Sequence, residues 1–499
     1  KEFKQGKKHL EEEINEKLGL LANQIMSEIR IIPDMRISYF DLSSKERFEA
    51  VSAPKEAQAH PNWAIDIVCS ITEEGDSYRF LLQMVNNTSV ESTIDLGYVP
   101  RIFNAGIKIV GDEGIEFQDI ELEYFKNSYK DREPIYAVAE NTSVKFDADS
   151  NTIETDNIPV YYQNRLITKD KYNNYITFQK LIDDPVGNLG IIHKEMLKDY
   201  QQRLNEFNST VFASSNAKRK FGEDLDTYKQ EIDRFERGIK QIEYKDFVKK
   251  SFAYMNKTFQ LEIGTGRVYP GWRLFQIVFI VSMICEMIRS EYKDDNTLAH
   301  TDIEVANLLY FPTGGGKTEA FMGCCVFAMF FDRLRGKEYG VTALLKYPLR
   351  LLAVQQLERV LVAVMKANII REQSAELKDK NKFELGFFVG KNNTPNNVSA
   401  REQLSDRGEF GTSRGLILES DEETLEEYYR FIDTCPVCGK KQVGVRFNRD
   451  NWKLEHYCKN PDCKVDELPL LIVDSEIYRY MPSIVVSTID KMAMLGTTN

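Results

Sequence analysis

The stretch FPTGGGKT at residues 311–318 decides the fold of the second half of this chain. An apolar run at 306–311 leads into the glycines, and helix-forming residues follow from Glu319 onward. Consecutive glycines allow successive backbone N–H groups to point into one concave space, and a helix N-terminus behind them adds about half a positive charge. A strand, a glycine-rich loop and a helix in this order bind phosphate groups. The stretch therefore predicts a nucleotide-binding loop.

The residues of this loop have separate expected roles. Lys317 is expected to reach the β- and γ-phosphates of ATP, and the Thr318 hydroxyl to ligate Mg²⁺, so these two are the candidate catalytic residues. A strict pattern has glycine five residues before Gly316, where this chain has Phe311. The alternative is a glycine turn beside an exposed Lys-Thr pair. The candidate ATP-binding residues are Gln276, Thr313, Gly314, Gly315, Gly316, Lys317, Thr318 and Glu319.

Residues 247–499 alternate apolar strands with helical stretches, which predicts a parallel α/β domain around the loop. The predicted strands are 306–311, 342–347, 386–390 and 484–487.

Four cysteines in the same half have the spacing of a metal site. Cys435 and Cys438 form C-x₂-C, and Cys458 and Cys463 form C-x₄-C. Four thiolates suit tetrahedral Zn²⁺ and leave no open position for a reactive water, so we expect a structural zinc ribbon. The ribbon would be an insertion at about residues 392–470 of the α/β domain. His456 is an alternative ligand, although we expect it at the surface.

The first half of the chain predicts three further segments. Residues 1–34 have apolar positions at helical spacing and predict an N-terminal helix. Residues 35–185 contain short β-branched and aromatic runs between turn residues, which predicts a β-rich domain. Residues 186–246 contain two heptad-like segments with a polar break and predict a helical hairpin or arm. The hairpin is interpreted as a packed spacer, with a partner-binding coiled coil as the alternative.

Composition excludes several classes of protein. Hydrophobic residues make up 42% and charged residues 28%, which is not the balance of a disordered or membrane-spanning chain. The formal charge of −12 argues against coating nucleic acid by bulk charge, but not against a local basic groove. The chain opens with charged residues instead of a signal peptide. We therefore expect a cytoplasmic protein with no membrane partner.

Several stretches together resemble superfamily 2 helicases. They are PTGGGKT at 312–318, YPLRLLAVQ at 347–355, SIVVSTIDKM at 483–492 and WRLFQ at 272–276. The resemblance implies that Arg350, Gln355 and Thr488 contact the phosphates of a single DNA strand in the motor groove. It also implies that Gln276 reads the adenine edge of ATP, with a helix-capping or core-edge amide as the alternative.

The resemblance further implies a RecA-like fold for residues 247–499, as the first of an expected pair. This superfamily completes its site with an Asp-Glu pair after an apolar strand. Asp474 and Glu476 follow an apolar run, but they precede the 483–492 motif and are separated by Ser475. We interpret them as unrelated to catalysis, and we expect ATP hydrolysis to require sequence beyond Asn499.

The set of motifs with a zinc insert most resembles the DrmA family, the helicase subunits of the bacterial DISARM anti-phage system, over roughly residues 265–499. The family implies an ATP-dependent DNA helicase or translocase that uses ATP and Mg²⁺ and acts in defence with a DrmB-like partner subunit. One alternative is an NTP-dependent switch or scaffold with a zinc-ribbon interaction module and no unwinding. Another is a zinc-ribbon interaction protein with a degenerate motor.

Overall fold

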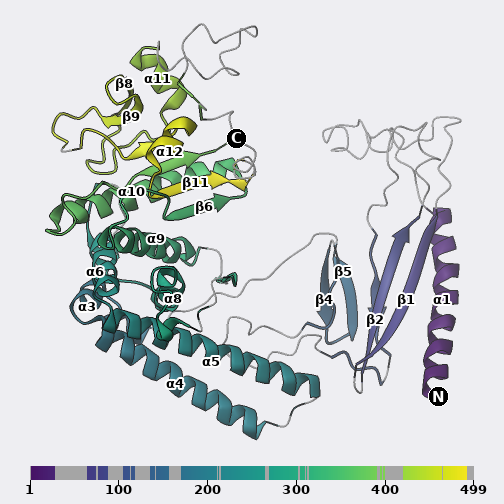
Figure 1. Cartoon of the computed structure of the whole chain (residues 1–499). Helices are drawn as coiled ribbons and strands as arrows, with labels where there is room; N and C mark the ends of the chain where they lie inside the picture. Colours follow the sequence, from purple (N-terminus) through teal and green to yellow (C-terminus); the bar gives the residue numbers. More distant parts are fainter. Residues whose placement is uncertain are drawn as a thin grey trace, which may run out of the picture. The chain divides into compact units, whose positions relative to one another are not determined.

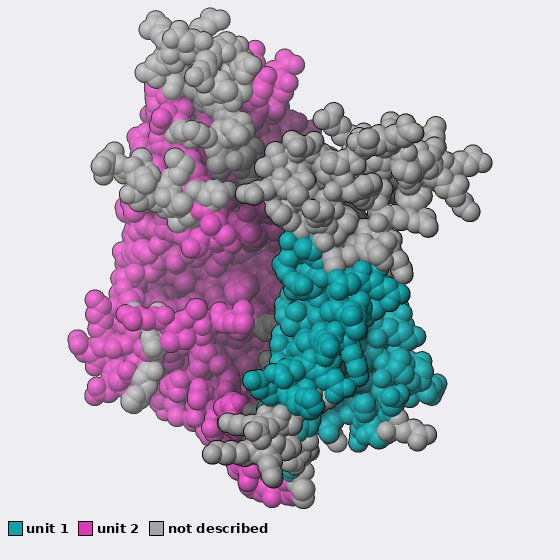
Figure 2. Space-filling model, turned by 90° about the vertical axis from the view of Figure 1, so that its right-hand side faces the viewer, with its two compact units in different colours: residues 1–123, 132–162, 212–217 teal, residues 124–131, 163–211, 218–499 magenta. Residues whose placement is uncertain are grey.

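The computed structural model describes most of the chain as two compact units (Figure 1). The described residues are 2–28, 64–74, 77–87, 105–112, 114–118, 135–140, 142–156, 170–210, 212, 215–264, 269–299, 301, 304–309, 311, 314–389, 394–395, 397–398, 420–463, 465–489 and 491. Figure 2 colours the units, of which one holds residues 1–123, 132–162 and 212–217 and the other the remainder. Within the described residues, every helix is too short or too polar to cross a membrane.

The smaller unit combines one helix with short antiparallel strands. Helix α1 (Glu2–Glu28) packs on β1 (Ile65–Glu74), which pairs antiparallel with β2 (Ser77–Asn86). The Asn15 side chain accepts from the Cys69 N–H at 2.7 Å and donates to the Cys69 carbonyl at 2.9 Å, so α1 satisfies both backbone groups of this β1 residue. A second sheet has the order β3 (Lys108–Val110), β5 (Thr152–Asp156), β4 (Ser143–Asp147). These strands lie within the predicted β-rich segment.

The larger unit begins with helices that pack as a hairpin. After η2 (Asp170–Tyr175) and α3 (Phe178–Asp183) come α4 (Pro185–Ser209) and α5 (Ser215–Tyr244). The rings of Phe207 and Phe221 lie 5.4 Å apart and those of Tyr200 and Tyr228 6.2 Å apart, as two antiparallel helices require. Residues 170–175 and 178–183, which lie within the predicted β-rich segment, are helical and belong to this larger unit.

A four-stranded parallel sheet is the centre of the α/β part. Its order is β10 (Leu470–Leu471), β7 (Leu385–Phe388), β11 (Ile484–Thr488), β6 (Ala343–Tyr347). One face contributes Phe387 and Val486 to a large apolar core. The other face contributes Phe388 and Val485 to a small cluster with Ile477 of α12 (Asp474–Tyr480). The parallel α/β prediction is therefore confirmed.

The remaining helices surround this core. They are α6 (Asp246–Gln260), α7 (Leu274–Ser282), α8 (Ile284–Ile288), η3 (Asn296–Leu298), α9 (Lys317–Leu334) and α10 (Arg350–Gln373). Both α9 and α10 contact β6, and α6 packs against both helices. The cysteine-rich part consists of α11 (Glu422–Tyr429) and an antiparallel hairpin of β8 (Val443–Asn448) and β9 (Lys453–Cys458).

The strand predicted at 306–311 is wrong for the residues that are described there. Residues 304–309 and 311 have no strand pairing, and the Leu308 side chain is 87% exposed. An apolar run forms a strand only when a neighbouring strand receives its backbone N–H and C=O groups. Among the described residues, β6 pairs with β11 and with no strand from this run.

Candidate functional site

The glycine loop (residues 311–318) leads directly into α9. Gly314 has a φ of +79° and Gly316, the N-cap of α9, a φ of +92°. These left-handed values strain any residue with a Cβ atom, which explains why glycine occupies both positions. Thr313, a predicted ATP-binding residue, lies outside the described residues.

Helix α9 begins with Lys317, Thr318 and Glu319. The first is the predicted phosphate-binding residue and the second the predicted magnesium ligand. The Lys317 Nζ atom donates to the backbone carbonyl of Phe311, so the lysine folds back over its own loop. Thr318 is the second residue of α9, close to the positive end of the helix. Glu319 forms an ion pair with Arg359 of α10. The loop therefore brings Lys317 and Thr318 together at one helix N-terminus.

Helix α7 contacts the loop from the side. Arg273, the N-cap of α7, donates from Nη1 to the Gly315 carbonyl at 2.7 Å. Gln276 donates from Nε2 to the Gly316 carbonyl at 2.8 Å and accepts from the Arg273 N–H at 2.7 Å. Gln276 is 5% exposed, and its amide caps α7 as in the alternative interpretation. The adenine-reading role of Gln276 stays a prediction.

Sequence reasoning missed two contributors to this arrangement. Arg273 and Phe275 both lie within the WRLFQ stretch at 272–276, but only Gln276 of that stretch has a predicted role. The Phe275 ring stacks on Phe311, with centroids 3.8 Å apart and planes 14° apart. Phe311 occupies the position where a strict pattern has glycine, and that departure was the available signal.

The predicted DNA-contacting residues follow two adjacent parallel strands. Thr488 ends β11 and lies opposite Tyr347, which ends β6, so both motifs reach the same edge of the sheet. Arg350 begins α10, but its side chain lies outside the described part, whereas Gln355 is exposed on that helix. Thr488 is 2% exposed, and its hydroxyl has no hydrogen-bond partner among the described residues.

The carboxyl groups of Asp474 and Glu476 are both engaged by partners within the fold. Asp474 pairs with Lys491, and burial raises the pKa of Asp474 against the pull of that lysine. Glu476 accepts from the Leu454 N–H at 2.8 Å, and burial raises the pKa of Glu476 to about 8. Both carboxyl groups are held inside the protein between α12 and its neighbours.

The four predicted metal ligands converge. The sulfur atoms of Cys435, Cys438, Cys458 and Cys463 all lie within 4.8 Å of one another. The sulfurs of Cys435 and Cys463 are 3.9 Å apart, and those of Cys438 and Cys458 3.7 Å apart. Tetrahedral zinc with bonds of about 2.3 Å places its sulfurs about 3.8 Å apart. The cluster therefore fits a zinc ribbon.

The ribbon is packed against the rest of the unit. The Gly264 N–H, just after α6, donates to the Val437 carbonyl in the first cysteine turn at 3.1 Å. A Cβ at Gly264 would lie 2.6 Å from the Gly439 nitrogen, so the two backbones are in direct contact. His456 is fully buried with Nε2 3.0 Å from the Tyr429 carbonyl, so the expectation of a surface histidine is wrong. Its β9 position faces α11 instead of water.

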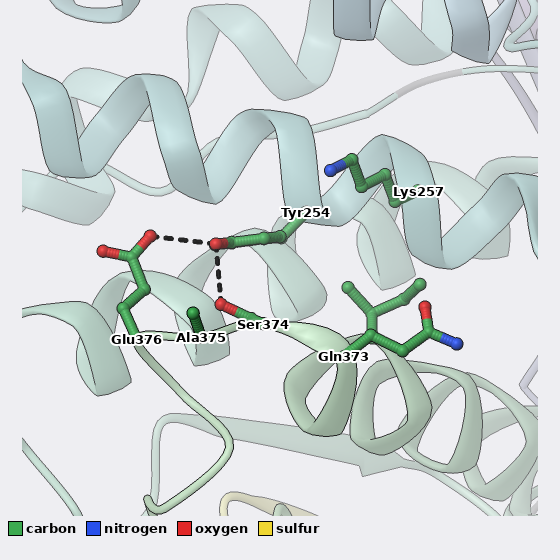
Figure 3. A pocket seen from close by; sticks show the side chains of 7 residues that line it. Tyr254, Lys257, Gln373, Ser374, Ala375 and Glu376 are labelled. Atoms are coloured by element: carbon green, nitrogen blue, oxygen red, sulfur yellow. Dashed lines mark hydrogen bonds between the residues drawn. The ribbon is translucent and has the colours of Figure 1, made fainter.

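A pocket of about 500 Å³ lies elsewhere, between α6 and the end of α10 (Figure 3). The Tyr254 hydroxyl contacts the Ser374 hydroxyl at 2.8 Å and donates to Glu376 at 2.9 Å. Lys257 and Gln373 lie beside them, and none of the predicted site residues lines the pocket. Tyr254, Ser374 and Glu376 thus satisfy one another at its wall.

Comparison with known proteins bears on the whole arrangement. No protein-family model matches the chain. Over 261 residues it is 32% identical to the DISARM protein DrmA of Bacillus paralicheniformis, a match that covers 49% of this chain and 22% of DrmA. The chain therefore spans less than a quarter of the length of that relative. The resemblance predicted from the motifs is confirmed: this chain is similar to the DISARM protein DrmA.

Proposed function

We propose that this chain carries the first RecA-like domain of an ATP-dependent DNA helicase or translocase of superfamily 2 that acts in anti-phage defence. The observation that carries the proposal is the glycine loop. Gly314 and Gly316 have left-handed backbones, and Lys317 begins α9 directly after them. Similarity to DrmA supports a role in defence.

The chemistry of phosphoryl transfer explains what these residues would do. Such reactions depend on positioning and charge stabilisation, because little covalent work is left to the protein. The Lys317 ammonium would leave the Phe311 carbonyl to hold the β- and γ-phosphates, while Thr318 would ligate the Mg²⁺ that accompanies ATP. Asp474 and Glu476 are engaged elsewhere, in contacts with Lys491 and with the Leu454 N–H, so we assign neither of them to hydrolysis.

The DNA strand would cross the edge of the sheet where β6 and β11 end. Thr488 ends β11, and Arg350 and Gln355 lie on α10, which follows β6. Ligands of parallel α/β sheets bind at the carboxyl ends of the strands. Contacts to phosphates would make the hold independent of sequence. A partner subunit like DrmB belongs to the same proposal, and the zinc ribbon is one surface that such a partner could contact.

Lys317→Ala tests the proposal in the complete protein. We expect DNA-stimulated ATP turnover to be abolished, because the charge that holds the terminal phosphates is removed. The measurement is phosphate release with and without single-stranded DNA. Lys240→Ala is the matched control, since Lys240 is an exposed lysine of α5 that pairs with Glu236 at 2.8 Å. Turnover that survives in Lys317→Ala would remove the basis of the assignment.

A second candidate is an NTP-dependent switch. The contacts of Arg273 and Gln276 with the loop favour it, because they join the loop to α7 and would carry a nucleotide signal into the fold. ATP turnover that ignores DNA, together with partner binding that requires ATP, would support the switch over the helicase.

A further inference from the structure

Helix α7 holds the carbonyl side of the glycine loop at two successive residues. Arg273 donates to the Gly315 carbonyl at 2.7 Å and Gln276 to the Gly316 carbonyl at 2.8 Å. The two side chains are also joined, because the Gln276 carbonyl oxygen accepts from the Arg273 N–H at 2.7 Å. One helix N-terminus therefore restrains two neighbouring peptide groups of the loop.

Peptide geometry determines what these bonds do to the opposite side of the loop. A trans peptide is planar, and its C=O and N–H point in opposite directions. Holding the Gly315 carbonyl therefore orients the N–H of Gly316, and holding the Gly316 carbonyl orients the N–H of Lys317. Backbone N–H groups at this position are the ones that bind phosphate oxygens in glycine loops. The α7 side chains thus set the direction of two phosphate donors.

An aromatic stack restrains the start of the same loop. The Phe275 and Phe311 rings are nearly parallel, with centroids 3.8 Å apart. Stacked pairs of this kind contribute stability beyond the area they bury. Because the stack ties the first residue of the loop to α7, it accounts for phenylalanine where a strict pattern has glycine.

Gly316 is shaped to receive this helix. A Cβ at Gly316 would lie 2.7 Å from Nε2 of Gln276, so the glutamine amide fills the space that a side chain would need. The left-handed φ of +92° at the same residue is a second reason for glycine at this position.

We propose that Arg273 is a positioning residue of the glycine loop, acting with Gln276 and with the Phe275–Phe311 stack to orient the N–H groups that bind the triphosphate. The proposal rests on the proposed function, since it concerns the same nucleotide site. In this proposal Arg273 affects the binding of the phosphates, through the loop backbone, and does not affect recognition of the base. Its loss should therefore weaken any Mg²⁺-bound triphosphate equally, whatever base is attached.

The test compares three ligands in the purified protein with Mg²⁺: ATP, GTP and inorganic tripolyphosphate. Arg273→Ala is expected to weaken each ligand about tenfold, as expected when a hydrogen bond to a charged group is lost. Arg273→Lys should recover part of the affinity, because an ammonium can still donate to the Gly315 carbonyl. The melting temperature without ligand should remain unchanged. Competition with a fluorescent ATP analogue gives all the affinities.

Arg289→Ala is the matched control. Arg289 also donates to backbone carbonyls, those of Tyr292 and Lys293 at 3.0 and 2.6 Å, but these lie outside the loop. Its affinities should equal those of the wild type. A loss in Arg273→Ala that is confined to ATP, or no loss for any ligand, would overturn the proposal.

The outcomes separate this inference from the proposed function. If Lys317→Ala abolishes triphosphate binding while Arg273→Ala binds as tightly as the wild type, only the positioning role fails. If the wild type binds neither nucleotide nor tripolyphosphate, the nucleotide site itself fails, and the positioning role fails with it.

Discussion

Glu476 shows at the scale of single residues how burial assigns a role. An acidic residue soon after an apolar strand has the pattern of a catalytic carboxylate. In the structure the Glu476 side chain is buried and accepts a hydrogen bond from the Leu454 N–H at 2.8 Å. This bond joins α12 to β9. Removing a carboxyl group from water disfavours its charged form, so the pKa of Glu476 rises to about 8. The group is therefore suited to holding two elements together.

The raised pKa of Glu476 predicts a pH-dependent stability. Between its ordinary pKa of 4.5 and about 8, the folded protein holds a proton that the unfolded chain has released. Glu476 therefore contributes stability that is fully present below pH 4.5 and is lost as the pH rises through about 8. Glu476→Gln keeps an acceptor for the Leu454 N–H but does not titrate. We expect the variant to gain stability relative to the wild type by a few kcal/mol at most over this range.

Urea unfolding at about pH 5 and about pH 8 measures this difference. Glu427→Gln, at an exposed position of α11, is the control for the substitution itself. If the unfolding free energies of wild type and Glu476→Gln change in parallel with pH, that result would contradict the assignment.

At the scale of elements, the zinc ribbon depends on the β8–β9 hairpin. Cys435 and Cys438 precede β8, Cys458 ends β9, and Cys463 follows it, so the hairpin brings the two cysteine pairs together. The contact of Gly264 with the first cysteine turn makes the ribbon part of the larger unit.

Removing one ligand should therefore affect more than the ribbon. If the four thiolates hold zinc, Cys438→Ser is expected to lose that zinc and to lower the free energy of unfolding by several kcal/mol, because metal binding stabilises the folded site. Metal analysis and thermal melting of wild type and variant provide the measurement. Cys324→Ser removes a half-buried thiol of α9 outside the cluster and should keep its zinc. Full zinc content in Cys438→Ser would show that the cluster is not the metal site.

Local pattern predicted the helices of the hairpin better than it predicted one strand. Apolar positions at helical spacing mark α4 and α5 because the hydrogen bonds of a helix are made within the segment itself. The run at 306–311 has the composition of a strand but no partner among the described strands. A strand, unlike a helix, requires a neighbour that local sequence does not contain.

At the scale of the molecule, the larger unit has its own core. Every member of the large apolar cluster lies between Ile176 and Val486, and none lies in 212–217, so the cluster includes no residue of the smaller unit. This core joins α3, α6, α7, α9 and α10 to one face of the parallel sheet.

A truncated chain of residues 163–499 should consequently fold. We expect one cooperative thermal transition, retained zinc and a rise in melting temperature with Mg²⁺ and ATP, because ligand binding to the folded state stabilises it. Circular dichroism and metal analysis, with the full chain measured in parallel, test the expectation. A truncated chain without a cooperative transition would mean that residues 1–162 contribute to the fold of the larger unit.

The sequence by itself determined the features that depend on residues close together in the chain. The three glycines before Lys317, the spacing of the four cysteines and the helical periodicity of α4 and α5 are local, since their chemistry or hydrogen bonding is completed within a short segment. The motif match to the DrmA family has the same local origin.

Only the tertiary structure decided which side chains hold the glycine loop and which acidic groups are buried. Arg273 and Gln276 lie about forty residues before the carbonyls they contact. Glu476 lies twenty-two residues from Leu454, the residue whose N–H donates to it. Such pairs are set by the packing of whole helices and strands around one core. Burial and distance between residues far apart in the chain are properties of that packing, so they follow from the fold and not from any local pattern.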